Sequence, residues 1–301
     1  MSASKKRSNS KPSPLTDQQQ TDEQTPRELR GFDLQGHRGA RGLLPENTLP
    51  AFRKALELGV PTLELDVVIS ADDEVIVSHD PWMSAEICSL PSGEPVPDGE
   101  EKTHRLFGMT CDEIARYDCG QRGHPAFPSQ QARPAAKPRL TAVIEMAERY
   151  CRDAERSPPR YNIETKIRPE WEGRFCPDPE TFTQLVYGVV AETGILERAM
   201  LQSFDPRTLR VARDLDDSCT LSMLRARPGQ RGFIRKLGFT PDVYSPNHRL
   251  LMRRSVQAAH RRGMKVVPWT VNTEKRMRHL RRWGVDGLIT DYPDMGMQVV
   301  G

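Results

Sequence analysis

Two histidines and three acids occupy positions from which they could act on an anionic ester. His37 and His79 end short apolar segments, in "FDLQGH" and "EVIVSHD", whereas Glu64, Asp66 and Glu164 lie within "TLELDVVI" and "YNIETKI". Imidazoles accept and donate protons near neutral pH. Carboxylates that are buried together require a cation or strong hydrogen-bond donors. The pattern therefore predicts acid–base chemistry beside a bound cation.

The acids lie on one face of their strands. Side chains alternate along a strand, so Glu64 and Asp66 point away from the apolar residues of "TLELDVVI", and Glu164 points the same way as Lys166 in "YNIETKI". Oxygen ligands favour a hard divalent ion, Ca²⁺ or Mg²⁺, over zinc. Each acid alone also fits an ordinary ion pair at the surface, and Glu164 with Lys166 fits a structural pair.

The elements that position these side chains alternate between strand and helix patterns. Alternation of this kind predicts parallel pairing, and eight or nine strands in about 270 residues match an α/β fold, the (β/α)8 TIM barrel. An open doubly wound sheet is the alternative. The strand candidates are 32–37, 62–70, 74–80, 160–167, 199–204, 219–225, 242–247, 265–271 and 287–291.

A parallel barrel would bring the candidate residues to one mouth, because the carboxyl ends of its strands open on the same face. His37 ends the first strand and His79 the third, so both imidazoles are expected there with the acids. The remaining histidines lie in loops, in Arg-rich helices and in a Pro-rich region, and are expected at the surface. They are His104, His124, His248, His260 and His279.

The chain divides into a tail and one domain. Residues 1–30 are rich in Ser, Lys, Gln and Pro, so a disordered polar tail is expected. Residues 31–301 form the predicted barrel. Within it, residues 81–139 lack a clear period and are rich in Pro, Gly and polar residues, which indicates an insertion after the third strand.

Composition limits the classes of partner and compartment. The 301 residues include 44 Lys and Arg against 41 Asp and Glu, so a formal charge of +3 gives no support for a nucleic-acid or membrane partner. Six cysteines without a CxxC pair suggest reduced thiols, although Cys111 and Cys119 could pair in an oxidising compartment. No secretory signal or membrane span is recognised, so we expect a cytoplasmic protein without stable membrane insertion.

The turn after the first strand, "GHRGARGLLPENTLPAF", has a pattern suited to a phosphate. Its glycines allow a sharp turn and close approach of the backbone to an anion. Asn47 is the expected N-cap of the next helix, which should end at Glu57 and Leu58 before a left-handed Gly59. Glu46 fits either a contact to the site or a favourable acid at a helix start.

Seven strings in order resemble the glycerophosphodiester phosphodiesterase family: "HRGARGLLPENTLPAF", "LELDV", "VSHDP", "IETK", "QSFDP", "PWTVN" and "DGLITDYP". The resemblance covers about residues 31–295. It implies a barrel that uses a divalent metal to hydrolyse glycerophosphodiesters to sn-glycerol 3-phosphate and an alcohol, in glycerol and lipid metabolism. It also implies the roles of individual residues: His37 and His79 as the acid and base, Glu64, Asp66 and Glu164 as metal ligands, and Arg38 and Lys166 as phosphate ligands.

Two other residues each have two possible roles. Trp269 ends a strand, where it could line the mouth and bind substrate or pack in the core. Asp205, before Pro206, fits a helix N-cap better than a site residue. The sequence leaves open which histidine is the acid, and whether water or a substrate hydroxyl attacks.

The substrate and the reaction have alternatives as well. The segment after His79 differs from familiar members of the family, so choline, ethanolamine, inositol, glycerol or a lipid-like group all remain possible as the alcohol. A phospholipase-D-like enzyme acting on phospholipids and a non-catalytic phosphate-binding barrel are the other functions considered.

Overall fold

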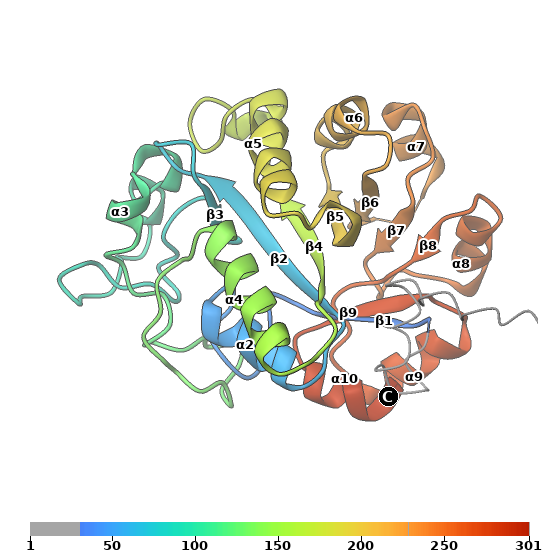
Figure 1. Ribbon diagram of the computed structural model, residues 1–301, viewed down its shortest axis with the longest axis horizontal. Helices are drawn as coiled ribbons and strands as arrows, with labels where there is room; N and C mark the ends of the chain where they lie inside the picture. Colours follow the sequence, from blue (N-terminus) through green and yellow to red (C-terminus); the bar gives the residue numbers. More distant parts are fainter. Residues whose placement is uncertain (1–30, 228, 301) are drawn as a thin grey trace, which may run out of the picture.

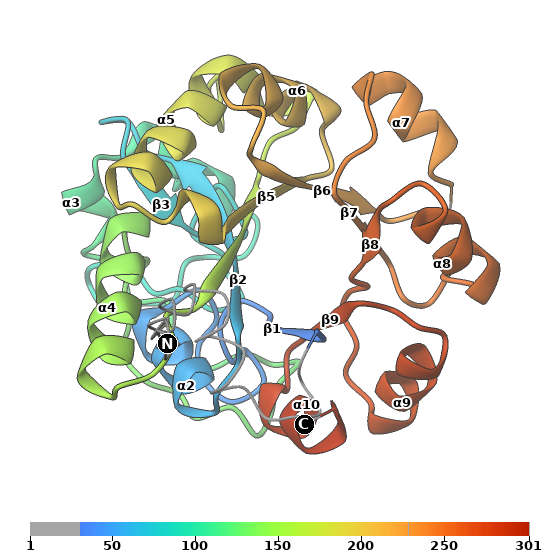
Figure 2. The same ribbon diagram turned by 45° about the vertical axis from the view of Figure 1, so that its right-hand side comes forward.

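The computed structural model of the protein describes residues 31–227 and 229–300. Strands form an inner ring and helices an outer ring (Figure 1 and Figure 2). The tail 1–30, for which the sequence predicts disorder, lies outside the described residues. Within the described part, none of the helices has the length and apolar character needed to cross a membrane.

Eight parallel strands build the inner ring in the order β8-β7-β6-β5-β4-β2-β1-β9. The backbone amide of Asp286 donates to the carbonyl of Val266, and the amide of Ile289 donates to the carbonyl of Pro268. These hydrogen bonds place β9 beside β8, so the ring is nearly closed. The predicted (β/α)8 barrel is confirmed. The strands are β1 (Asp33–Gly36), β2 (Thr62–Ile69), β4 (Arg160–Thr165), β5 (Ala199–Ser203), β6 (Thr220–Arg225), β7 (Val243–Pro246), β8 (Lys265–Val266) and β9 (Gly287–Thr290).

One helix follows each barrel strand and covers the outside of the ring. Short 3₁₀ turns, η4 (Pro169–Trp171) and η5 (Leu196–Arg198), precede α5 and β5. Asp205 caps α6 by accepting a hydrogen bond from the Arg207 amide, as its sequence context predicts. The helices are α2 (Leu49–Glu57), α4 (Leu140–Asp153), α5 (Pro179–Glu192), α6 (Pro206–Leu215), α7 (Arg231–Leu237), α8 (Arg253–His260), α9 (Glu274–Arg282) and α10 (Pro293–Val300).

The start of α2 differs from the prediction by one residue. Thr48, not Asn47, is the N-cap, and its hydroxyl accepts from the Ala51 amide. Asn47 has a left-handed backbone (φ 55°) and donates its side-chain amide to Asp66 instead. The predicted end is confirmed, because Leu58 is the C-cap and Gly59 has φ 82°.

The third strand in the chain, β3 (Val75–Val77), lies outside the ring (Figure 1). It pairs antiparallel with β2, with Val77 opposite Val67. The expectation that His79 ends a parallel strand is therefore wrong. The chain instead folds back along β2, and the Ser78 amide donates to the carbonyl of Asp66 at 2.9 Å, which returns His79 to the level of the acids.

The insertion 81–139 packs on the outer side of this hairpin. It contains η2 (Glu101–Thr103), η3 (Leu106–Gly108) and α3 (Cys111–Ile114). Val68 and Ile76 of the hairpin contribute to its small apolar core, which is separate from the main core of the barrel. The other buried members are Met83, Ile87, Cys88, Val96, Leu106, Cys111, Ile114 and Cys119.

A disulfide joins Cys88 to Cys119 within the insertion, with an S–S distance of 2.19 Å. The expectation of reduced thiols is wrong for this pair, and the partner of Cys119 is Cys88 rather than Cys111. Four cysteines are free and buried: Cys111, Cys151, Cys176 and Cys219.

The barrel interior is polar where it supports the site. Asn162 donates to the side-chain oxygen of Gln35 at 2.6 Å, and Gln202 donates to Glu64 at 2.7 Å, all four being fully or nearly fully buried. Buried polar groups are stable only when they are paired. These pairs therefore hold the side chains of β1, β2, β4 and β5 in fixed orientations beneath the mouth.

Candidate active site

Three carboxylates meet at the mouth of the barrel. Glu64 and Asp66 come from β2 and Glu164 from β4, and the parallel register sets Asp66 directly opposite Glu164. One oxygen of each side chain lies within 4.8 Å of one oxygen of each of the others. All three residues are buried. The alternation predicted from the sequence thus produces a compact acidic cluster.

Neighbouring groups fix these carboxylates but leave one oxygen without a partner. Glu64 accepts from Gln202 and from the Arg38 amide. Asp66 accepts from Asn47 at 2.9 Å through Oδ2, yet its buried Oδ1 has no hydrogen-bond donor among the described residues. Lys166 Nζ lies 3.6 Å from this oxygen. An unpaired buried carboxylate oxygen is costly unless a ligand completes it.

Burial sets the protonation of the cluster. It raises the pKa of Glu64 well above its usual value, with repulsion from Asp66 and Glu164 adding to the effect. The pKa of Glu164 is raised by burial as well. For Asp66, burial acts in the same direction, but Arg38 and Lys166 outweigh it and lower the pKa. Burial and mutual repulsion therefore disfavour the state in which all three carboxylates are charged, unless a further cation joins them.

Two cations lie against the acids. Arg38 has a left-handed backbone (φ 50°), and its side chain contacts Asp66 at 3.0 Å and Glu46 at 2.7 Å. Lys166 donates to Glu164 at 2.7 Å. Of the two readings of Glu46, contact with the site is the one that the structure bears out. Both cations are nearly buried, so the mouth can hold an anion beside the acids.

His37 is held by an acid that sequence reasoning missed. Its Nδ1 lies 2.5 Å from Asp291, which follows β9, and its Nε2 lies 4.0 Å from Glu64. Asn272 donates to the other oxygen of Asp291 at 2.5 Å. Burial lowers the pKa of His37, although Asp291 opposes the shift. Asp291 stands in the quoted string "DGLITDYP" directly after a strand, which was the signal that could have identified it.

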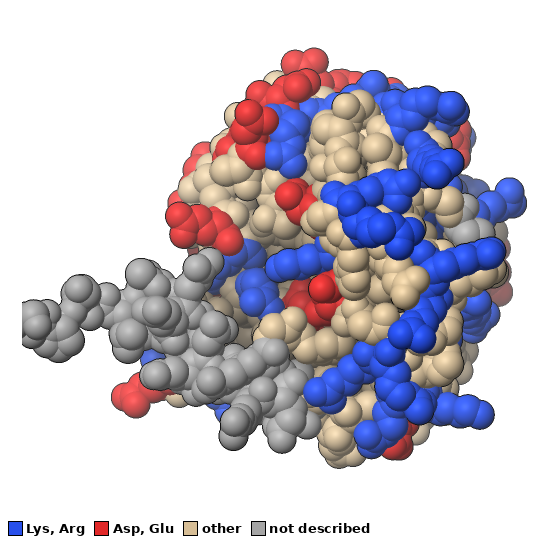
Figure 3. All heavy atoms as spheres, turned by 90° about the vertical axis from the view of Figure 1, so that its right-hand side faces the viewer, with Lys and Arg blue, Asp and Glu red and all other residues tan. Residues whose placement is uncertain are grey.

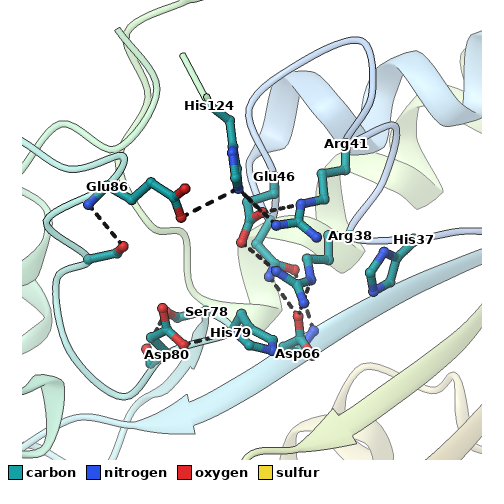
Figure 4. A network of polar contacts seen from close by, with 12 residues as sticks. His37, Arg38, Arg41, Glu46, Asp66, Ser78, His79, Asp80, Glu86 and His124 are labelled. Atoms are coloured by element: carbon teal, nitrogen blue, oxygen red, sulfur yellow. Dashed lines mark hydrogen bonds and ion pairs between the residues drawn. The ribbon is translucent and has the colours of Figure 1, made fainter. Parts of the chain in front are cut away.

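His79 has a carboxylate partner of its own. Its Nδ1 lies 2.9 Å from Asp80, and its side chain is 36% exposed at the mouth. Burial lowers the pKa of His79, and the positive charges of Arg38 and Lys166 lower it further. In Figure 4, Arg38 and Asp66 lie between the imidazoles of His37 and His79. The two histidines thus face the acid cluster from different elements.

Lys137, at the end of the insertion, is a second residue that the sequence did not reveal. It is buried, and its ammonium donates to the Ser78 hydroxyl at 2.8 Å. That hydroxyl donates to the carbonyl of Asp80 at 2.6 Å. Lys137 therefore supports the segment on either side of His79. A lysine in a Pro-rich run gives no pattern from which burial can be inferred.

The insertion contributes His124 to the edge of the site (Figure 4). Arg41 lies 2.9 Å from this imidazole and also contacts Glu46. Glu86, another residue of the insertion, lies 3.9 Å from the same ring. The side chain of His124 is only 7% exposed, so the expectation of a surface residue is wrong for it.

Trp269 lies at the mouth end of the barrel in the segment after β8. Its ring nitrogen donates to the carbonyl of Ser245 at 2.9 Å, and the ring meets Phe204 edge-on at 5.7 Å between centroids. Phe204 follows β5 and is 41% exposed. The two rings form an apolar edge of the mouth, and a substrate contact of Trp269 stays a prediction.

The donor set fits a hard divalent cation. Only oxygen atoms converge, they come from three carboxylates, and Asp66 Oδ1 has no donor within the described part of the chain. Such oxygen ligands match Ca²⁺ or Mg²⁺. A cation there would also relieve the repulsion from Asp66 and Glu164 that adds to the effect of burial on the pKa of Glu64.

Comparison with protein families gives one match over most of the chain. The model of the glycerophosphoryl diester phosphodiesterase family matches residues 37–295. The glycerophosphodiester phosphodiesterase of Bacillus subtilis strain 168 is 24% identical, over 86% of this chain and 83% of its own. That of Caldanaerobacter subterraneus subsp. tengcongensis is 25% identical, over 88% and 96%.

Solved structures share the fold. A structure from Silicibacter pomeroyi DSS-3 has a TM-score of 0.79 at 26% identity and covers 91% of this chain and 96% of its own. A phosphodiesterase from Oleispira antarctica, solved with the product sn-glycerol-3-phosphate, has a TM-score of 0.70 at 20% identity, with 89% and 96% covered.

Proposed function

The chain belongs to the glycerophosphoryl diester phosphodiesterase family and is an enzyme of that class, and from this premise we propose a metal-dependent reaction with two histidines. In the proposed reaction, a glycerophosphodiester is hydrolysed to sn-glycerol 3-phosphate and an alcohol. The acidic cluster holds a divalent metal, and His37 and His79 transfer the protons. The product in the related Oleispira antarctica structure is consistent with this substrate class.

The observation that carries the proposal is the convergence of Glu64, Asp66 and Glu164 within 4.8 Å, with one buried oxygen of Asp66 left without a donor. These three residues would hold the metal. When bound, a divalent metal polarises a phosphoryl oxygen and stabilises negative charge that develops on it. Three carboxylates, the cations Arg38 and Lys166, a dication and a monoanionic phosphodiester together carry no net charge.

Arg38 and Lys166 are proposed to bind the phosphate. Both already lie at hydrogen-bond or ion-pair distance from the acids that would hold the metal. A guanidinium and an ammonium placed there can meet the non-bridging oxygens as they gain charge during attack. Glu46 fixes the Arg38 side chain at 2.7 Å and so limits the orientations of its guanidinium.

His37 and His79 are proposed to share the proton transfers, one accepting a proton from the attacking oxygen and one donating to the leaving alkoxide. Asp291 and Asp80 bind the Nδ1 atoms, which leaves each Nε2 to face the reacting groups. A carboxylate at Nδ1 also stabilises the imidazolium that forms on the base. Trp269 and Phe204 are proposed to contact the apolar parts of the substrate.

An assay with several glycerophosphodiesters tests the proposal. Purified protein is incubated with the choline, ethanolamine, inositol and glycerol diesters and with Ca²⁺, Mg²⁺ or Mn²⁺, and sn-glycerol 3-phosphate is measured. We expect EDTA to abolish release. We expect His37→Ala and His79→Ala each to lower the rate by at least about 100-fold, as loss of a general acid or base does.

His260→Ala is the matched control, since His260 is exposed at the end of α8 and pairs with Asp286 at 2.8 Å. It should keep the parent rate. The metal and acid–base roles are refuted if EDTA leaves hydrolysis intact or if His260→Ala is as damaging as His37→Ala. Absence of hydrolysis with every diester and metal would refute the substrate class.

The cytoplasmic location expected from the sequence is retained as a proposal, and the disulfide gives it a direct test. Disulfides persist in oxidising compartments and are rare in the cytoplasm. With the Cys88–Cys119 bond formed, the protein denatured without reductant should show four titratable thiols, which would speak against a cytoplasmic location. Six thiols, one for each cysteine in the chain, would show that the bond is not formed in the cell and would support that location.

A further inference from the structure

The net charge of the chain is near neutral, but its positive and negative residues are unevenly distributed along the sequence. Between residues 225 and 285 there are 16 Lys and Arg but only two acids, whereas the rest of the chain has 28 Lys and Arg against 39 acids. Figure 3 shows Lys and Arg gathered on the face over α7, α8 and α9. The overall balance therefore does not describe this side of the molecule, which is strongly positive.

Both acids of this segment are already paired. Asp242 contacts Arg213 at 3.3 Å, and Glu274 contacts Arg278 at 2.8 Å. No carboxylate among the described residues pairs with Arg231, Arg254 or Arg261. Exposed cations that repel one another without counter-charges favour the binding of an anionic surface.

Some of these cations line a cleft between α7 and α8. Arg254 lies in the first turn of α8 and Arg261 is its C-cap, so the two side chains are two turns apart on the same side. The small Ala258 between them also lines the cleft. The volume is about 480 Å³, and Arg231 of α7 forms the opposite wall. This cleft has the size and charge for phosphate headgroups.

Two exposed apolar side chains lie in the loop that leads into α8, just before Arg254 of the cleft. Leu250 and Met252 are 46% and 47% exposed, whereas Leu251 between them is buried and anchors the loop. Met252 has an extended backbone (φ −117°, ψ 149°), so side chains alternate and Leu250 and Met252 share the outer side. Arg249, Arg253 and Arg254 flank them in the sequence, and all three are exposed.

We propose that this surface, defined by Leu250, Met252 and the arginines of the α7–α8 cleft, docks on an anionic phospholipid bilayer. The arginines bind headgroup phosphates while the two apolar side chains enter the interface between headgroups and acyl chains. Sites that bind single-stranded nucleic acid carry aromatic side chains between the cations, on which the bases stack. Exposed aliphatic side chains contribute nothing comparable to such binding. The aliphatic pair therefore favours lipid.

The apolar part of the docking surface lies close to the mouth. The loop with Leu250 and Met252 follows β7, so it belongs to the same end of the barrel as the acid cluster. His248 in this loop donates its amide to the carbonyl of Trp269, which ties the loop to the edge of the mouth. Docking would bring the mouth next to the lipid surface. The inference goes beyond the proposed hydrolysis and does not depend on it.

Vesicle sedimentation tests the inference with the full chain. Vesicles of phosphatidylglycerol with phosphatidylcholine are compared with vesicles of phosphatidylcholine alone, at low and high salt. We expect binding to the anionic vesicles only, with loss at high salt because screening weakens exposed charges. Arg254→Gln with Arg261→Gln should weaken binding by at least about tenfold.

The apolar pair separates a bilayer from other polyanions. Leu250→Ser with Met252→Ser should weaken vesicle binding several-fold while retention on a heparin column stays unchanged. Arg116→Gln with Arg152→Gln is the matched control, because the charge change is the same and both arginines are exposed. Arg116 follows α3 and Arg152 lies in α4, across the molecule from α7 and α8. The control should bind as the parent does.

Three results would overturn the inference. The parent protein could fail to bind anionic vesicles at low salt, or the control could lose as much binding as the cleft variant. Vesicle binding that survives replacement of Leu250 and Met252 would show that neither side chain enters the bilayer and that the surface attracts polyanions by charge alone. Because binding and hydrolysis are measured separately, failure here leaves the proposed reaction untouched.

Discussion

Lys137 has a local role that can be tested at the residue scale. Its ammonium joins Ser78, whose hydroxyl holds the carbonyl of Asp80 beside His79. Lys137→Met keeps the length of the side chain but removes this hydrogen bond. We expect kcat to fall about tenfold with little change in KM, because a charged hydrogen bond that orients His79 is lost.

Lys137→Arg should recover part of the turnover, since it restores a cation at the same position. Thermal denaturation of each variant is measured alongside the kinetics. If Lys137→Met lowers the melting temperature but leaves kcat at the parent value, Lys137 stabilises the fold and does not position His79.

The pKa of His37 gives a second prediction at this scale. Burial lowers it below the ordinary value of 6.5, and Asp291 partly opposes that shift by stabilising the imidazolium. Asp291→Asn removes the opposing charge, so the pKa of His37 should fall further. NMR titration of the His37 ring measures this directly in the metal-free protein, and a rise in pKa would contradict the role of Asp291.

The lowered histidine pKa values also predict how the rate depends on pH. A histidine that acts as base must be neutral, and burial lowers the pKa of both His37 and His79. The acid limb of kcat/KM should therefore lie below pH 6.5 in the parent enzyme. In Asp291→Asn it should move to lower pH if His37 is the base and should stay in place if His79 is.

At the scale of elements, the N-cap of α2 has a measurable effect. Thr48 accepts from the Ala51 amide, and the helix that it starts follows directly on the turn containing Arg38 and Glu46. Thr48→Ala should lower the free energy of unfolding by about 1 kcal/mol, as the loss of a threonine N-cap does. Denaturant unfolding measures the change, and an unchanged midpoint would show that the cap hydrogen bond contributes nothing.

The sequence predicts where strands and helices occur better than it predicts whether a strand pairs parallel or antiparallel to its neighbour. Alternation in "TLELDVVI" places Glu64 and Asp66 together because period-two patterning is a local property of one strand. The reversal at β3 depends on the short turn between residues 70 and 74 and on pairing with β2, which the apolar pattern of "EVIVSHD" does not encode. His79 was thus expected at the mouth for the wrong reason.

Partners from distant segments were the least predictable. Asp291 lies 254 residues from His37 in the chain and Gln202 lies 138 residues from Glu64, so no local pattern links them. The Cys88–Cys119 bond spans 31 residues without a spacing motif. The barrel itself was predictable because helix–strand alternation and helix ends repeat along the chain.

At the scale of the whole molecule, metal binding should change stability. A cation that binds only the folded chain raises the melting temperature as its concentration increases. We expect Ca²⁺ or Mg²⁺ to raise the melting temperature and EDTA to reverse the shift. Glu64→Gln should remove most of the shift, because one ligand charge is lost, and a shift equal to that of the parent would place the metal elsewhere.

The two ends of the insertion are held side by side on the barrel. The Val77 amide donates to the carbonyl of Pro138 at 2.8 Å, and Ile76 bridges Arg139, so the chain leaves and returns at almost the same point. Such an excursion can be lengthened, shortened or exchanged during evolution while the barrel keeps its shape. Lys137 and His124 both belong to the insertion. Replacing the insertion would therefore alter the surroundings of His79 and Glu46 together.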